Sequence, residues 1–111
     1  MYMMTFTEGI GTIKFSFAAA PTGPWSAPQD VCTPSGQTAS VFAYNAKAHP
    51  EQSDHRGLLV SYNVNSLDIY ESLEVAATYR PRFIRVPWTV VQLMANAANQ
   101  SLHCRLAISA A

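Results

Sequence analysis

The stretch that decides the fold is YMMTFTEGIGTIKFSFAAA, residues 2–20. It holds two strand-like runs, 2–8 and 12–20, on either side of a short turn with two glycines, which adopt positive φ angles easily. Side chains of a strand alternate between the two faces of its sheet. The second run places three apolar side chains on one face: Ile13, Phe15 and Phe17. The stretch therefore predicts an antiparallel β-hairpin.

More extended segments follow at short intervals along the chain. Strand-forming residues occupy 29–33, 41–51, 58–66 and 80–88, with turn-forming or loop segments between them. No helical pattern lies between neighbouring strands, which excludes parallel β–α–β units. We therefore predict an all-β fold built from antiparallel meander sheets.

The C-terminal residues, 89–111, differ in composition from the rest. They are rich in Ala, Leu, Asn and Gln, and apolar side chains recur there at helical spacing: Val90, Leu93, Met94 and Ala97. The sequence predicts that this tail is helical or disordered.

Composition excludes several classes of function. The chain has 111 residues, a formal net charge of zero and 13% charged residues. It therefore has no electrostatic signature of a protein that binds nucleic acid or an anionic membrane. The N-terminus lacks the features of a signal peptide and reads as the middle of a strand, so we expect the natural start of the domain to lie upstream.

The two cysteines give no evidence of a metal site. Cys32 and Cys104 are far apart in the sequence, and no Cys-x-x-Cys pair is present. A disulfide between them and two free thiols are both compatible with the sequence. We predict no metal ligands in this chain.

An unusual tryptophan lies in the turn that follows the hairpin. The segment AAAPTGPWSAPQ, residues 18–29, contains three prolines and a glycine around Trp25. One explanation is that the loop packs the indole against a neighbouring sheet, as between the blades of a β-propeller. The other is that Trp25 caps a small hairpin core, as in many β proteins.

The ordered set of these segments resembles a known family. The segments YMMTFTEGIGTIKFSFAAAPTGPWSAPQDV, YNAKAHPE, LLVSYNVNS and YRPRFIRV together resemble blade elements of five-bladed β-propeller glycoside hydrolases, in a secreted branch of microbial and fungal proteins. The resemblance covers residues 2 to about 88. It implies that residues 1–88 form an incomplete propeller of about two partial blades, followed by a divergent tail at 89–111.

The resemblance also implies a function. Intact relatives would act on or bind extracellular glycans in an axial channel, with no cofactor other than a channel metal ion such as calcium. Most of the catalytic carboxylates would lie on upstream blades that this chain lacks. The resemblance implies an extracellular location and a glycan or polysaccharide partner. A chain that cannot close a ring would also self-associate through its open sheet edges.

Strand alternation nominates catalytic and binding residues near the end of 41–51. The odd positions would share one polar face: Asn45, Lys47, His49 and Glu51. Lining a channel, Asn and Lys would bind sugar hydroxyls, and His would serve as an acid or base. The alternative is a strand with one solvated face.

The carboxylate chemistry of a glycosidase needs a second acid. Glu8 ends the first strand on the face of Met4 and Phe6, where an apolar environment would suit a general acid. Glu8 and Glu51 are the best pair for hydrolysis by two carboxyl groups. The alternative for Glu8 is an ion pair with a nearby Lys or Arg.

Three more residues are candidates for substrate binding. Asn63 and Asn65 share a face of 58–66 with Ser61, and would bind hydroxyl groups or satisfy loop backbone groups. Arg82 would bind a carboxylate, or it would belong to a structural ion pair. Three functions stay open: a carbohydrate-active fragment, a non-catalytic glycan-binding or interaction module, and an incomplete gene product without independent activity.

Overall fold

The computed structural model describes all residues except 10, 69, 71–79, 101–108 and 111. The described part is mostly β structure. Its strands are β1 (Tyr2–Thr7), β2 (Ile13–Ala18), β3 (Gln29–Cys32), β4 (Val41–Ala48), β5 (Leu58–Ser66), β6 (Arg82–Val86) and β7 (Ser109–Ala110). A 3-10 turn, η1 (Pro50–Gln52), follows β4, and one helix, α2 (Trp88–Gln100), follows β6.

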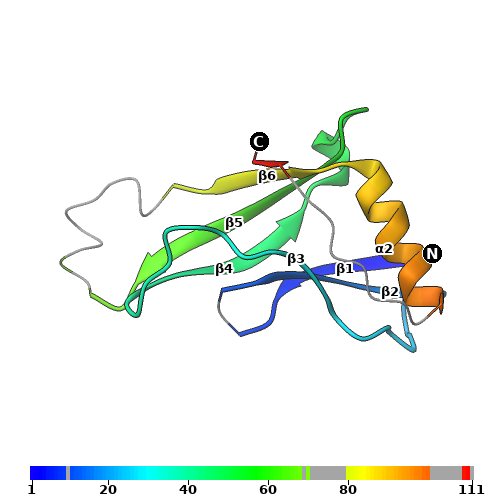
Figure 1. The fold of residues 1–111 in the computed structure, drawn as a ribbon, viewed down its shortest axis with the longest axis horizontal. Coiled ribbons are helices and arrows are strands. Elements are labelled where there is room, and N and C mark those ends of the chain that lie inside the picture. The colour runs from blue at the N-terminus through cyan, green and yellow to red at the C-terminus, as the bar shows by residue number, and fades with distance from the viewer. Residues whose placement is uncertain (10, 69, 71–79, 101–108, 111) are drawn as a thin grey trace.

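The strands form two antiparallel sheets in meander order. One sheet has the order β1-β2-β3 and the other the order β4-β5-β6-β7 (Figure 1). The predicted hairpin is confirmed, because Met3 pairs with Phe17 and Thr7 pairs with Ile13. The prediction of meander sheets is confirmed with it, whereas a propeller arrangement stays a prediction.

One hydrophobic core joins the two sheets. Ile13, Phe15 and Phe17 of β2 are buried, as the alternation predicts. They belong to the same cluster as side chains from the other sheet, Leu58, Val60, Ile84 and Val86, and from the helix, Val90, Met94 and Ala95. Each large apolar side chain buried in this way contributes about 1.5–3 kcal/mol to folding. The two sheets are therefore parts of one folded body.

The helix covers one end of this core. Figure 1 shows α2 crossing the end of the molecule where the N-terminus lies. The helical prediction for the tail is thus confirmed over its first part, and residues 101–108 lie outside the described residues. The prediction is wrong at Ser109–Ala110, which pair with β6 as strand β7. The predicted boundary at residue 88 stays a prediction. No helix in the described part of the chain has the length and apolar character needed to cross a membrane.

A β-bulge in β4 changes the predicted alternation. Tyr44 pairs with Asn63 and Lys47 pairs with Ser61, so two residues of β4, Asn45 and Ala46, stand opposite a single residue of β5. Asn45 takes a positive φ of 56°, which asparagine tolerates better than most residues. The prediction that every odd position from 45 to 51 shares a face by strict alternation is therefore wrong.

A distant strand supports the bulge. Thr7 of β1 accepts a hydrogen bond from the main-chain N–H of Ala46 at 3.0 Å. Nearby, the N–H of Gly11 donates to the carbonyl of Ala43 at 2.9 Å. These bonds satisfy backbone groups that the irregular ladder leaves open, and they hold β1 beside β4.

The turn around Trp25 depends on glycine. Trp25 is half-buried, and Gly23 adopts a φ of 90°. A Cβ atom at Gly23 would lie 3.1 Å from Cδ1 of the indole. Glycine therefore lets the ring lie close against its own turn.

Candidate functional site

Aromatic and polar side chains share the outer face of the four-stranded sheet. Directly paired residues of an antiparallel ladder point to the same side. The pairs here are Phe42 with Asn65, Tyr44 with Asn63, Lys47 with Ser61, and Ser61 with Phe83. The buried core residues occupy the alternate positions. We call this surface the β4–β6 face and define it by these seven residues.

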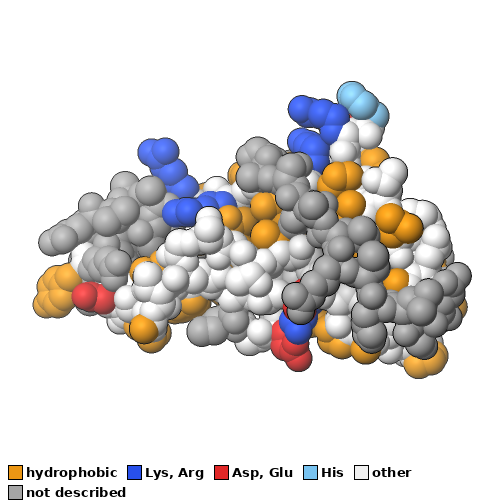
Figure 2. Space-filling model, in the orientation of Figure 1, with side chains coloured by type: hydrophobic (Ala, Val, Ile, Leu, Met, Phe, Trp, Pro, Cys, Tyr) orange, Lys and Arg blue, Asp and Glu red, His pale blue; other side chains and the backbone are white. Residues whose placement is uncertain are grey.

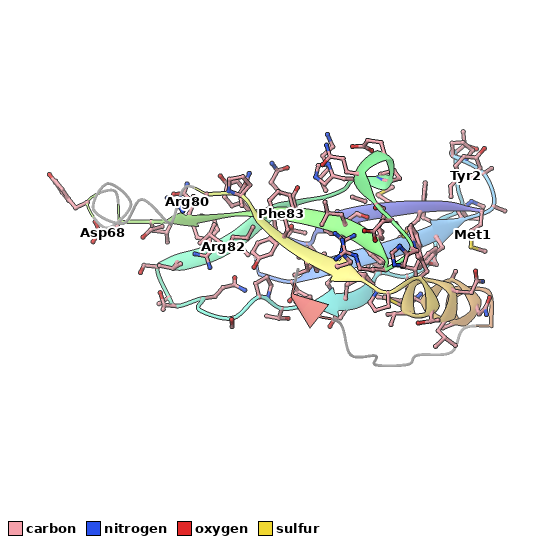
Figure 3. The ribbon with its side chains drawn as sticks, turned by 90° about the horizontal axis from the view of Figure 1, so that it is seen from above. Met1, Tyr2, Asp68, Arg80, Arg82 and Phe83 are labelled. Carbon is pink, nitrogen blue, oxygen red and sulfur yellow. The ribbon has the colours of Figure 1, made fainter. Side chains whose placement is uncertain are left out.

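The aromatic side chains of the β4–β6 face are partly exposed. The rings of Phe42 and Tyr44 lie 5.7 Å apart between centroids, inclined at 54°. Phe83 is 40% exposed and lies on β6 next to Arg82 (Figure 3). A half-exposed sheet face with rings and amides side by side can contact a ligand that has both apolar and hydroxyl surfaces. The sequence analysis missed these three rings, although the spacing of Phe42 and Tyr44 places them on one side of a strand.

The predicted binding residues fall on both sides of the sheet. Lys47, Asn63 and Asn65 lie on the β4–β6 face. Arg82 pairs with Tyr62, at a position that alternation places on the opposite side. Burial raises the pKa of Tyr62, and the positive charge of Arg82 acts against this increase. The structure thus separates Arg82 from the two asparagines. Asn45 is exposed at the bulge.

The structure brings His49 and Glu51 together with Ser61. His49 Nε2 lies 2.7 Å from Ser61 Oγ, and His49 Nδ1 lies 3.5 Å from Glu51 Oε1. The imidazole is 18% exposed and the carboxylate 65% exposed. The contact between His49 and Ser61 follows from the β4–β5 register. The η1 turn then carries Glu51 back toward the histidine. The sequence analysis placed Ser61 on a polar face for binding hydroxyl groups or satisfying loop backbone groups, and did not place it beside His49.

Glu8 belongs to a different cluster. Its carboxylate forms an ion pair with Lys14 Nζ, which also lies 3.2 Å from Asp30 Oδ1. Hydrogen bonds to Glu8 and then to Asp30 raise the pKa of Lys14. The Glu8 side chain is 59% exposed, so the expected apolar environment is wrong, and the alternative of an ion pair with a nearby Lys is confirmed. Glu8 pairs with Lys14 of β2, whereas Glu51 lies in η1 beside His49, so the two carboxylates belong to different clusters.

A third cluster surrounds Asp54 and has no counterpart in the sequence analysis. Arg56 makes two side-chain hydrogen bonds to Asp54 Oδ2, of 2.9 and 2.7 Å. Arg85 donates to Oδ1 at 3.1 Å, and the indole N–H of Trp88 donates to the Asp54 carbonyl at 2.6 Å. Figure 2 shows Lys, Arg and His side chains gathered above the connection that contains η1. This cluster fixes the start of α2 on the sheet.

An apolar pocket lies between β1, the end of β4 and α2. Its volume is about 800 Å³, and its lining includes Met3, Phe17, Leu58, Trp88 and Ala95. Met1 and Tyr2 stand at this end of the molecule, far from Asp68 at the opposite end (Figure 3). The pocket is large enough for a small organic ligand. Its polar lining side chains are Thr5, Lys47, Gln92 and Asn96.

The described residues offer no cluster of three or more His, Cys, Asp or Glu side chains that could hold a metal ion. Burial raises the pKa of the Cys32 thiol, which lowers its reactivity as a thiolate. The other cysteine, Cys104, lies outside the described residues. The structural ion pair expected for Arg82 would use Glu71 or Glu74, and both lie outside the described residues too.

Most of the chain matches the model of one protein family. A family model described as a domain of unknown function, DUF5005, matches residues 1–96. The chain belongs to this family. The DUF5005 match includes both sheets up to β6 and the first two turns of α2, so it contains the β4–β6 face and the Ser61–His49–Glu51 cluster. No curated protein and no solved structure matches the chain.

Proposed function

We propose that this DUF5005 domain is a glycan-binding module of an extracellular carbohydrate-active protein, and that the β4–β6 face is its binding surface. The observation that carries the proposal is the ladder register, which pairs Phe42 with Asn65 and Tyr44 with Asn63 and places Phe83, the partner of Ser61, on the same face. Such a face suits an extended polysaccharide better than a compact ligand.

The chemistry of sugars supports this proposal. A pyranose ring has apolar C–H faces that pack on aromatic rings, and hydroxyl groups at its rim that exchange hydrogen bonds with amides. Tyr44 and Phe83 supply partly exposed rings on β4 and β6. Asn63 lies on β5 between these strands and supplies both donors and an acceptor.

The resemblance to five-bladed propeller glycoside hydrolases supports an extracellular, glycan-related role for the larger protein. Meander sheets are the building units of propeller blades. Glycosidic bond cleavage by this chain has weaker support, because that chemistry uses two carboxyl groups on either side of one bond. The carboxylate of Glu8 is instead held by Lys14.

Affinity electrophoresis against a panel of soluble polysaccharides tests the proposal. We expect the wild-type chain to be retarded by at least one polysaccharide. We expect Tyr44→Ala and Phe83→Ala each to weaken that binding about tenfold, which corresponds to about 1.4 kcal/mol.

Tyr2→Ala is the matched control. It removes a partly exposed aromatic ring at the apolar pocket, on the other sheet. We expect it to leave polysaccharide binding unchanged. Binding that falls only with Tyr2→Ala would assign the ligand to the pocket, and the absence of binding to every polysaccharide would overturn the proposal.

A further inference from the structure

We infer that Ser61, His49 and Glu51 form a Ser–His–Glu triad that hydrolyses carboxylic esters with short acyl groups. A nucleophilic hydroxyl, an imidazole and an acid that orients the imidazole are the three parts of such a triad, which occurs on unrelated folds and is recognised by geometry. Here the hydroxyl-to-imidazole distance is 2.7 Å, within hydrogen-bonding range.

Local structure fixes the backbone that carries the imidazole. The His49 N–H donates to the carbonyl of Leu59 at 2.9 Å. Ser53 Oγ donates to the carbonyl of His49 at 2.7 Å and accepts from the N–H of Leu59 at 2.9 Å. The backbone of His49 is therefore anchored to β5, which is the strand that carries Ser61. The ring needs little reorganisation to meet the hydroxyl.

The contacts also indicate the tautomer of the ring. Glu51 Oε1 faces Nδ1 at 3.5 Å, which favours a proton on Nδ1. Nε2 is then free to accept the hydroxyl hydrogen of Ser61. Contacts of this kind are often long in a ligand-free site and shorten when a substrate binds. Glu51 acts through His49, so it is a positioning residue and not a catalytic one.

The reaction follows from this arrangement. Ser61 Oγ bonds to the carbonyl carbon of the ester while its proton moves to His49 Nε2. The bond from that carbon to the alcohol oxygen then breaks, and the alcohol leaves with the proton from His49. Water attacks the acyl-serine, gives one proton to His49, and releases the carboxylic acid as Ser61 recovers the proton.

The neighbours of Ser61 set the substrate class. Ser61 lies in the interior strand of its sheet, so its peptide groups face the β4 and β6 ladders and do not form an oxyanion hole. Lys47, its direct partner on β4, is the cation that would stabilise the negative oxygen of the tetrahedral intermediate. Phe83, its partner on β6, is 40% exposed and supplies apolar surface. An acyl group on Ser61 would therefore rest on a partly exposed sheet face, which favours short acyl groups.

The alcohol part of the substrate rests on the proposed function. A polysaccharide that lies along the β4–β6 face would bring acyl groups on its hydroxyls to Ser61. The triad itself depends only on the three side chains. Activity on a small ester is therefore expected whether or not a polysaccharide binds.

Two measurements on the purified chain test the triad: hydrolysis of p-nitrophenyl acetate, and labelling by a fluorophosphonate probe followed by peptide mass spectrometry. We expect the probe on Ser61. We expect Ser61→Ala and His49→Gln to abolish labelling and to lower hydrolysis about a hundredfold or more. Glu51→Gln should lower kcat about tenfold with KM and the thermal midpoint unchanged.

Ser40→Ala is the matched control, because Ser40 is a partly exposed serine in the loop before β4. It should keep full labelling and activity. Labelling that is absent from Ser61, or that persists in His49→Gln, would overturn the triad. Ester hydrolysis without polysaccharide binding would overturn only the proposed function, and binding without labelling would overturn only the triad.

Discussion

At the scale of single residues, Asp54 shows how strongly a turn can be held by charge. Its carboxylate accepts hydrogen bonds from Arg56 and Arg85, and its carbonyl accepts one from Trp88. The bonds from Arg56 are the main cause of a decrease in the pKa of Asp54 from 3.8 to about 2. One aspartate thus links the turn before β5, strand β6 and the start of α2.

The depressed pKa of Asp54 makes stability depend on pH. A carboxyl group with a lower pKa in the folded state than in the unfolded state stabilises the fold above its unfolded pKa. That contribution is fully present above about pH 4 and is lost as the pH falls toward about 2. We expect Asp54→Asn to lower the thermal midpoint by a few degrees at pH 7. The difference in thermal midpoint between Asp54→Asn and the wild type should become smaller between pH 4 and pH 2, as measured by circular dichroism melts. A difference that stays constant down to pH 2 would contradict this account.

At the scale of elements, the helix and the sheets share a core. Met94 of α2 is 3% exposed and belongs to the core cluster. Its carbonyl also accepts a hydrogen bond of 2.9 Å from the buried amide of Gln29. Leu93, the preceding residue, is 49% exposed. One helix therefore offers a core residue and a surface residue side by side.

We expect Met94→Ala to lower the free energy of unfolding by about 2–5 kcal/mol, because it leaves a cavity in the core. Leu93→Ala removes a side chain of similar size from the surface, and it should change stability by about 0.5 kcal/mol or less. Urea denaturation of both variants checks this. Equal losses would mean that α2 does not pack on the sheets as described.

Strands β1 to β6 could be predicted from sequence, but the β-bulge in β4 and the short strand β7 could not. The alternation of Ile13, Phe15 and Phe17 with polar residues shows which face of the strand is buried. The hairpin can therefore be predicted from the local sequence pattern. The bulge at Asn45 is supported by a hydrogen bond to Thr7, which is distant in the sequence. No local sequence pattern therefore predicts the bulge. The bulge and the η1 turn also decide which side chains meet His49. For this reason the sequence nominated His49 and Glu51 without finding the serine beside them.

At the scale of the whole molecule, the sharing of one core by two sheets is a property that no strand pattern contains. The cluster takes residues from β2 and β3 together with residues from β4, β5 and β6. Within each sheet, strands that are neighbours in the sequence pair with each other. Packing between the two sheets depends instead on the twist of each sheet and on the position of α2. The alternation of apolar residues shows that a face is buried, but not what buries it.

The free edge of the three-stranded sheet decides whether copies associate. β3 is an edge strand of four residues, and Asp30 in it is 63% exposed and pairs with Lys14 at 3.2 Å. Short edge strands with a charged side chain resist pairing with another chain. We expect the protein to be a monomer of 12.1 kDa in size-exclusion chromatography with light scattering, and Asp30→Val to raise the measured mass. Glu51→Gln, which removes an exposed carboxylate away from that edge, should leave the mass unchanged. Wild-type oligomers would instead favour an incomplete ring whose open edges recruit other copies, because a self-contained binding module has no need of a partner sheet.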